Sequence, residues 1–390
     1  MFACSQHRNS GRYGEVAASA RAATVSDRAI AASPCRRVAA SASVSDRAIA
    51  ASPCRRVAAS ASVSDRAIAA SPRRRVAASA LLAALLLAGC HGTHRKTIAV
   101  IPKATAHLFW VTVHAGAAAA GQDLNVDIEW NGPSSETDYA RQVQIVDSMI
   151  ARQVDGLVVA AQDRTTLNAS LDRAAAAHIP VTIFDSGVDS TNYMTYIATN
   201  NYQGGQMAAR KLAALLNGKG KVAMLMNAPG SKSTLDREAG FEDVLQKEFP
   251  NIHIVSRQFS MSDRAKGMAV AENFLTAQPD LDGIFASSEP SSVGAALALK
   301  SRGLAGKVKL VAFDASDDLV QDLKDGSIDA LVAQDPFKMG YEAVKSLVDK
   351  LHGGNPPKVI DLSAVVVTKG DLDKPEIKAL LFPDVKKYLN

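Results

Sequence analysis

The sequence contains one pattern twice, VTIFD at residues 181–185 and KLVAFD at residues 309–314. Each copy is a short apolar, β-branched run that closes on an aspartate. Such continuous apolar runs are typical of strands that are buried on both faces of a parallel sheet. The near-matching contexts of Asp185 and Asp314 therefore point to two similar sheets.

On both sides of these copies, from Thr97 onward, short β-branched runs alternate with longer Ala- and Leu-rich amphipathic stretches. The predicted strands are Thr97–Pro102, Val126–Trp130, Gly156–Ala161, Val181–Asp185, Lys221–Met226, Ile252–Gln258, Gly283–Ser287, Lys309–Asp314 and Asp329–Gln334. Helices are predicted between them, for example at Asp138–Gln153, Tyr202–Leu216 and Pro336–Leu351, the last one followed by Gly353-Gly354. The alternation predicts α/β units with parallel strands, in two domains that meet near Asn200.

Polar side chains follow several predicted strands directly: Lys103, Asp185, Ser288, Glu289, Asp314 and Gln334. Ligands of open parallel sheets bind beyond the carboxyl ends of the strands, so these side chains are candidates for a shared cleft. The alternative for each aspartate alone is that it caps the following helix.

Charge and cysteine divide the chain into a leader and a body. The 390 residues are 47% hydrophobic and 21% charged, enough to bury sizeable cores. Residues 1–89 hold 13 Lys and Arg against 4 Asp and Glu, which leaves 31 against 35 in the rest of the chain. The body is thus mildly acidic, and no nucleic-acid partner is expected. All four cysteines lie at or before Cys90, so the body has no disulfide, no thiol nucleophile and no cysteine zinc site.

The leader, residues 1–75, contains a unit that is repeated almost identically from Val25, Val44 and Val63. Each copy reads VSDRAIAASP(C/R)RRVAASA and is mostly Ala, Ser and Arg. This composition offers too little apolar surface to offset the entropy of ordering, so the repeats are expected to be disordered or not translated.

Residues 73–89 are predicted to be a lipoprotein signal segment. Arg73, Arg74 and Arg75 precede the uncharged, Ala- and Leu-rich stretch 76–89, which is shorter than the ~20 residues of a membrane-spanning helix. The sequence Leu-Ala-Gly-Cys that ends at Cys90 resembles the lipobox of bacterial lipoproteins, which implies cleavage before Cys90 and acylation of its sulfur. The alternative is a buried apolar helix that ends in cysteine.

The body resembles the periplasmic ribose-binding group of sugar-binding proteins over residues 97–370. The resemblance is seen in TIAVIPKATAHLFWVTVHAGA, DGLVVAAQD, HIPVTIFDSG, YIATNNYQGGQMAA, REAGF, SDRAKGMAVAENFLTAQPDLDGIFASSE, LVAFDAS and ALVAQDPFKMG, in this order. It implies the type I periplasmic binding protein fold, with two doubly wound parallel-sheet lobes and a hinge of three chain crossings near 199–202, 334–337 and 363–367. The implied N-terminal lobe is 97–200 plus 335–365, and the C-terminal lobe is 201–334 plus 366–390.

The resemblance also implies roles for individual residues. Phe109 and Trp110 would cover the apolar face of a sugar, whereas Asp185 and Asp314 would accept hydrogen bonds from its hydroxyls. Arg237 would donate from the second lobe, and Gln334 would bond at the hinge. The alternatives are core packing for the two aromatic residues, and for Arg237 a surface ion pair with Asp236 or Glu238.

The chain departs from the family pattern at five further candidate positions, which are Lys103, His107, Ser186, Ser262 and Ser288. His107, Ser186, Ser262 and Ser288 stand where the family commonly has Asn, Arg, an aromatic residue and Asn. Lys103 replaces a small polar residue. A modified or anionic sugar, or another polar metabolite, would fit Lys103 and His107 better than ribose itself.

The motifs of the sequence bear on three classes of function. The sequence has no Gly-x-Ser-x-Gly elbow, no phosphate-binding loop and no His-Glu-x-x-His motif, so no enzyme activity, cofactor or metal is predicted. A transcription regulator would need a helix-turn-helix where the repeats lie. The prediction is therefore a monomeric, extracytoplasmic, lipid-anchored protein that closes about its hinge on a small sugar and delivers it to an ABC transporter permease. A receptor that reports the ligand to a chemoreceptor or sensor kinase remains the alternative.

Overall fold

The computed structural model describes residues 95–389. The predicted leader of residues 1–75, the signal segment of residues 73–89 and Cys90 lie outside this range. Within it, no helix has the length and apolar character that crossing a membrane requires.

The first sheet has six strands, all parallel, in the order β11-β5-β4-β3-β1-β2. Its strands are β1 (Thr97–Ile101), β2 (Asp127–Trp130), β3 (Gly156–Val159), β4 (Val181–Phe184), β5 (Thr195–Thr199) and β11 (Val359–Leu362). The helices that accompany it are α2 (Leu108–Asp123), α3 (Tyr139–Ala151), α4 (Asn168–Ala176) and α10 (Pro336–Leu351). We call this sheet and its helices the first lobe.

The second sheet repeats the arrangement with the order β12-β10-β9-β8-β6-β7, and β12 alone runs antiparallel. Its strands are β6 (Gly220–Met226), β7 (Ile252–Phe259), β8 (Gly283–Ala286), β9 (Lys309–Phe313), β10 (Ala330–Ala333) and β12 (Val365–Val367). Its helices are α5 (Asn201–Leu215), α6 (Lys232–Glu248), α7 (Arg264–Ala277), α8 (Glu289–Ser301) and α9 (Asp317–Asp325). We call these elements the second lobe. The C-terminal segment adds η1 (Lys369–Asp371), α11 (Pro375–Leu381) and η2 (Val385–Lys387).

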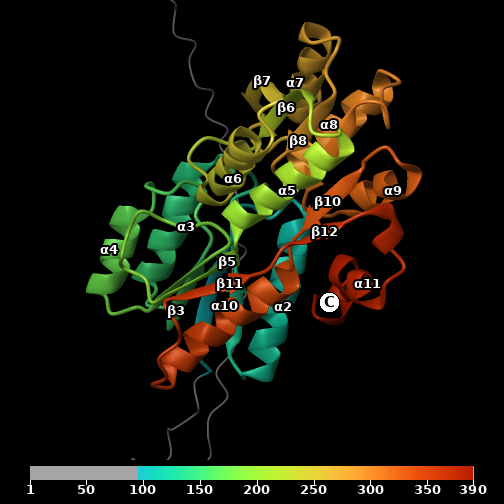
Figure 1. Ribbon diagram of the computed structural model, residues 1–390. Coiled ribbons are helices and arrows are strands. Elements are labelled where there is room, and N and C mark those ends of the chain that lie inside the picture. The colour runs from blue at the N-terminus through green and yellow to red at the C-terminus, as the bar shows by residue number, and fades with distance from the viewer. Residues whose placement is uncertain (1–94, 390) are drawn as a thin grey trace, which may run out of the picture. The chain divides into compact units, whose positions relative to one another are not determined.

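Each sheet is covered by helices on both faces, as Figure 1 shows. Along β1 the side chains of Ile98 and Val100 enter one core, and those of Ala99 and Ile101 enter another. All four are completely buried. Alternate side chains of a strand point to opposite faces of the sheet. Because both faces are buried here, the strands are continuous apolar runs in the sequence.

The predicted fold class is confirmed: two α/β sheets of mostly parallel strands form the body. All nine predicted strands overlap observed ones, and the helix predicted at Pro336–Leu351 has these bounds in the structure. Strands β5, β11 and β12 were missed. The chain passes between the sheets after β5, after β10 and between β11 and β12. The predicted residue limits of the lobes stay a prediction.

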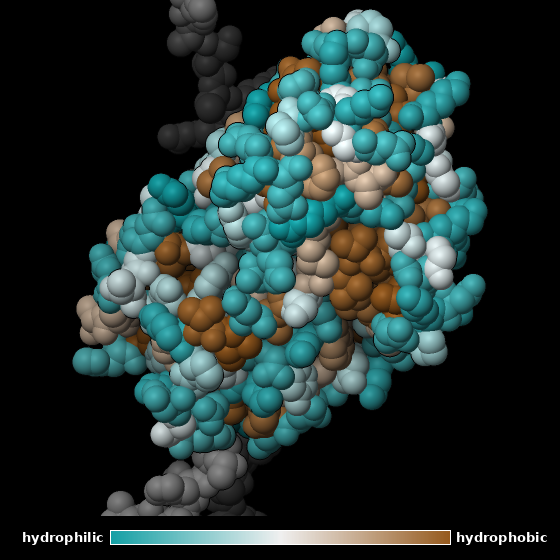
Figure 2. All heavy atoms as spheres, viewed as in Figure 1, coloured by the Kyte–Doolittle hydropathy of each residue, from teal (hydrophilic) through white to brown (hydrophobic). Residues whose placement is uncertain are grey.

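A groove lies between β12 and α11, apart from the site described below. Val365, Val366, Ile377 and Leu380 are among the residues that line it. Figure 2 shows hydrophobic side chains gathered near β12 on an otherwise largely hydrophilic face. The groove shares none of its lining residues with the cavity between the lobes.

Two close helix pairs depend on glycine. In the second lobe, α5 and α6 approach so closely that a Cβ atom on Gly205 would lie 1.9 Å from the carbonyl oxygen of Arg237. In the first lobe, a Cβ on Gly340 would lie 2.1 Å from the carbonyl oxygen of Val113, where α10 lies along α2 (Figure 1). Backbone atoms cannot move aside as flexible side chains can, so an added methyl group must push the helices apart.

We predict that Gly205→Ala lowers the free energy of unfolding by about 1–3 kcal/mol, the usual cost of overpacking. Gly370→Ala is the control, because Gly370 is exposed and an added Cβ would lie 3.9 Å from the Oγ1 atom of Thr368. Urea denaturation followed by circular dichroism measures both. Equal stability of the two variants would show that the α5–α6 contact relaxes without cost.

Candidate functional site

A cavity lies where the carboxyl ends of the two sheets face each other. In each sheet the strand order reverses beside the first strand, at β2-β1-β3 and at β7-β6-β8, which is where ligands of doubly wound sheets bind. The cavity is lined by Lys103, His107, Phe109, Trp110, Glu136, Asp185, Asn227, Ser233, Thr234, Arg237, Ser288, Glu289, Pro290, Asp314 and Gln334. Nine of the eleven predicted ligand residues are among them, and Ser186 and Ser262 are not.

Lys103 connects the two lobes. It follows β1 and is 3% exposed. Its ammonium group donates to Ser231 Oγ at 3.1 Å and to Ser233 Oγ at 3.0 Å, at the start of α6 in the second lobe. Its Nζ also lies 3.0 Å from Asp185 Oδ2 in the first lobe. The charge of Lys103 is therefore already matched by a carboxylate and two hydroxyls.

Ser186 makes a second contact between the lobes, beside the cavity. Its Oγ accepts a hydrogen bond from the backbone N–H of Ser233 at 3.2 Å. Ser186 is completely buried and contributes to the join between the lobes without lining the cavity.

Asp185 and Asp314 occupy matching places in the two lobes, directly after β4 and β9. Both have left-handed backbone conformations, with φ of 56° and 70°. Non-glycine residues adopt this conformation rarely, and here it turns both carboxylates out of the strand direction. The structure thus brings together the two aspartates from which the sequence argument started.

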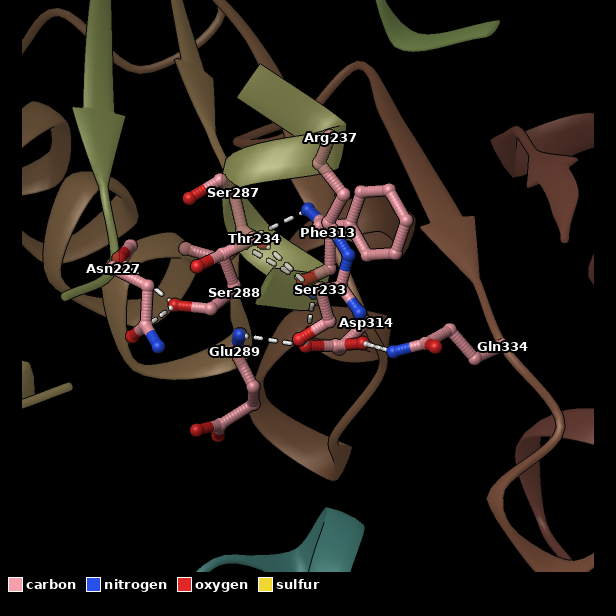
Figure 3. A network of polar contacts seen from close by, with 12 residues as sticks. Asn227, Ser233, Thr234, Arg237, Ser287, Ser288, Glu289, Phe313, Asp314 and Gln334 are labelled. Atoms are coloured by element: carbon pink, nitrogen blue, oxygen red, sulfur yellow. Dashed lines mark hydrogen bonds and ion pairs between the residues drawn. The ribbon is translucent and has the colours of Figure 1, made fainter. Parts of the chain in front are cut away.

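The Asp314 carboxylate lies in a polar network (Figure 3). Gln334 Nε2 donates to its Oδ1 at 2.5 Å, and the backbone N–H of Glu289 donates to its Oδ2 at 2.9 Å. Arg237 Nη1 lies 3.8 Å from Oδ2. Burial raises the pKa of Asp314 above its ordinary value, although Arg237 and the hydrogen bonds act in the opposite direction.

Gln334 lies where the chain leaves β10 and bonds to both lobes. Besides its bond to Asp314, its Oε1 accepts a hydrogen bond from Thr199 Oγ1 at 2.6 Å. Thr199 ends β5 of the first lobe, so one buried amide connects two of the chain crossings with the cavity.

Arg237 is 3% exposed and is held from three directions. Its Nε donates to Asn201 Oδ1 at 2.8 Å, its Nη1 donates to the carbonyl of Ser287 at 2.9 Å, and its guanidinium lies 3.9 Å from the centre of the Phe313 ring. The orientation of the guanidinium fork is thereby fixed. The alternative of a surface ion pair for Arg237 is wrong.

The two aromatic residues combine core packing with a place at the cavity. Trp110 is 2% exposed and packs in the core of the first lobe. The Phe109 ring packs edge-on against it, with 4.9 Å between the ring centroids. Both rings also line the cavity. Trp110 Nε1 donates to Glu136 Oε1 at 2.9 Å, which fixes the indole plane.

Glu136 lines the cavity from the loop after β2 and was not predicted. Its Oε2 accepts a hydrogen bond from Asn227 Nδ2 of the second lobe at 3.3 Å. Burial by itself raises the pKa of Glu136, but the charges of Lys103 and His107 and the bond from Trp110 outweigh it and hold the pKa below its ordinary value. Glu136 is thus a carboxylate of the first lobe that also joins the second.

His107 of the first lobe faces Glu289 of the second, with 3.9 Å between Nδ1 and Glu289 Oε2. Glu289 is 1% exposed and forms an ion pair with Arg264 through its Oε1. Burial raises the pKa of Glu289, and Arg264 and His107 oppose that effect.

Of the two remaining predicted serines, only Ser288 reaches the cavity. Its Oγ donates to Asn227 Oδ1 at 2.9 Å, so the pair fixes the amide orientation that lets Asn227 donate to Glu136. Ser262 does not line the cavity, but its backbone N–H donates a hydrogen bond to the carbonyl oxygen of Asn227 at 3.3 Å.

The lining residues missed by sequence reasoning are Glu136, Asn227, Ser233, Thr234 and Pro290. Glu289 was a candidate for the cleft because it follows a predicted strand, but no role toward a ligand was predicted for it. The missed residues lie in loops or at the starts of α6 and α8, where no periodicity marks them. Asn227 belongs to a stretch that suggested no more than a turn.

This arrangement is suited to binding a polyhydroxylated molecule. It combines four carboxylates with a fixed arginine fork and two aromatic rings, and these complement hydroxyl donors, hydroxyl acceptors and C–H faces. Among the described residues, no group of three or more His, Cys, Asp or Glu could hold a metal ion.

Comparison with known proteins agrees with this geometry. Residues 98–355 match the family model of the periplasmic binding protein domain. The chain is 31% identical over 226 residues to the ribose import binding protein of Bacillus subtilis, covering 58% of this chain and 72% of that protein.

Two solved structures with bound sugars are also similar. The solute-binding protein of a carbohydrate transporter from Agrobacterium radiobacter, in complex with D-arabinose, is 32% identical with a TM-score of 0.73, covering 74% of this chain and all of that one. An ABC transporter solute-binding protein from Agrobacterium vitis, with bound D-fucose, is 34% identical with a TM-score of 0.72, covering 73% and 100%. The chain therefore belongs to the periplasmic binding protein domain family and, within it, to the ribose-binding-like type I sugar-binding proteins.

Proposed function

We propose that the protein binds an uncharged monosaccharide in the cavity between its lobes and delivers it to the permease of an ABC importer. The relatives named above are binding proteins of sugar transporters, which supports binding in place of catalysis. The observation that carries the proposal is the pairing of Lys103 with Asp185, Ser231 and Ser233.

The charges of the site argue for an uncharged ligand. Lys103 lies 3.0 Å from Asp185, Arg237 lies 3.8 Å from Asp314, and Arg264 pairs with Glu289. Glu136 adds a further carboxylate. A phosphate or carboxylate on the ligand would find each nearby cation already matched, and it would lie among four carboxylates in a buried space, where unpaired charges are costly. The anionic alternative therefore has less support than the neutral one.

The same contacts support closure about the hinge. Asp185, Lys103 and His107 approach the cavity from the first lobe, and Arg237 and Asp314 from the second. Because the two sets surround one ligand only when the lobes are closed, a sugar would bind the closed form more tightly and shift the equilibrium toward it. The proposed lobes are residues 97–200 with 335–365, and 201–334 with 366–390.

The periplasmic relatives indicate an extracytoplasmic location. We further propose that Cys90 carries a lipid anchor behind a signal segment at residues 73–89, and that the protein acts as a monomer. A receptor function toward a chemoreceptor or sensor kinase would use the same closed form and remains the second candidate.

The proposed function predicts thermal stabilisation by neutral sugars. D-ribose, D-arabinose, D-fucose and further pentoses, hexoses and polyols are screened, with D-ribose 5-phosphate as the anionic comparison. A true ligand at about 100 times its Kd adds about 2.7 kcal/mol to stability, so Tm rises by several degrees. Stabilisation by the phosphate and by none of the neutral compounds would contradict the proposal.

The anchor is tested separately with radiolabelled fatty acid in cells that express the chain. Wild type should incorporate the label and partition with membranes, because acylation needs the Cys90 sulfur, and Cys90→Ser should do neither. Cys54→Ser, which changes a cysteine of the repeats, is the matched control and should behave like wild type. Equal labelling of wild type and Cys90→Ser would refute the anchor.

A further inference from the structure

Glu289 is a buried carboxylate, one oxygen of which has no hydrogen-bond partner among the described residues. It is the first residue of α8, directly after β8, and it is 1% exposed. Its backbone N–H is used by Asp314, whereas its side chain points away from that network (Figure 3). Oε1 pairs with Arg264, but Oε2 is buried without any hydrogen-bond partner among the described residues. A buried acceptor in that state costs stability.

The ion pair with Arg264 does not explain why Glu289 is buried. The Arg264 side chain is 40% exposed and also reaches Asp318, whose side chain is 67% exposed, at 3.4 Å. Ion pairs of such exposed groups contribute little. A surface carboxylate at the same helix end would interact equally well with Arg264 and with the helix dipole.

Glu289 lines the cavity together with His107 and Ser288. The His107 Nδ1 atom, 3.9 Å from Glu289 Oε2, is too distant for a hydrogen bond. Asp185 Oδ2 is in a similar state, because it has the charge of Lys103 beside it but no hydrogen-bond partner within residues 95–389. Both lobes thus present an acceptor that a ligand hydroxyl could satisfy.

We propose that Glu289 is a specificity-determining ligand contact, whose Oε2 accepts a hydrogen bond from one hydroxyl group of the bound sugar. This rests on the proposed function and deepens it. Sugars that lack a free hydroxyl at the position facing Glu289 and His107 are rejected, because they leave the buried carboxylate unpaired. The contact adds to those of Asp185, Arg237 and Asp314.

The test uses the full chain and the variant Glu289→Gln, which keeps the size of the side chain. Arg264 retains the amide oxygen, so the NH2 group takes the place of Oε2 and the acceptor is lost. The sugar among D-ribose, D-arabinose and D-fucose that raises the wild-type Tm most is titrated by calorimetry, together with its monodeoxy analogues. We expect the variant to bind this sugar about 10- to 100-fold more weakly, the range of a charge-assisted hydrogen bond.

The analogues separate contact from structure. Wild type should bind one monodeoxy analogue more weakly than the parent sugar by a similar factor. For Glu289→Gln the loss of affinity for that analogue should be much smaller, because the partner of the missing hydroxyl is already gone. Asp318→Asn is the matched control: it removes the other carboxylate on Arg264 without reaching the cavity, and its Kd should equal that of wild type.

The ligand-free Tm of Glu289→Gln should be equal to that of wild type or higher, because a buried acceptor without a hydrogen-bond partner is removed. A wild-type Kd for Glu289→Gln would overturn the inference, and so would the same analogue pattern in variant and wild type. If no sugar of any kind stabilises the wild type, the proposed function fails and this inference fails with it. If sugars bind and the analogue pattern does not change, only this inference fails.

Discussion

The buried ammonium group of Lys103 is the constraint on which the rest of the site depends. An ammonium ion taken out of water needs a nearby counter-charge and acceptors for its N–H groups. Lys103 lies beside the carboxylate of Asp185 in its own lobe and donates to two hydroxyls of the other lobe, at Ser231 and Ser233. It keeps these three contacts together only while the lobes are in contact. One side chain therefore couples the charge balance of the cavity to the distance between the lobes.

The second lobe also places a cation beside a buried carboxylate at the end of a strand. Asp314 stands after β9 as Asp185 stands after β4, both in the left-handed conformation, and Arg237 approaches it as Lys103 approaches Asp185. The difference lies in the partners. Arg237 is fixed entirely within its own lobe by Asn201, Ser287 and Phe313, so its side chain is preorganised before a ligand binds. Lys103 has no such support and depends on closure.

The sequence predicted most of the fold because buried parallel strands are continuous apolar runs. It missed β5, whose sequence TYIAT is mixed in polarity, and β11 and β12, which are short strands at the sheet edges. The strand-end rule gave Lys103, Asp185, Asp314 and Gln334 as candidates for a shared cleft, and all four line the cavity. The departure of Lys103 from the family pattern, however, suggested a cation that would favour an anionic ligand. The hydrogen bonds from Lys103 to Ser231 and Ser233 form only in the tertiary structure, and no local sequence pattern indicates them. The same is true of the contact of Glu136 with Asn227.

Small-angle X-ray scattering on wild type and Lys103→Met, each with and without the best-binding neutral sugar, tests most directly whether closure depends on Lys103. Wild type should have a smaller radius of gyration with sugar than without. Lys103→Met should contract less at the same sugar concentration, because methionine cannot donate to the serines of the second lobe. Closure that depends on Lys103 is refuted if the wild-type radius does not change although the sugar raises Tm, or if Lys103→Met contracts as fully as wild type.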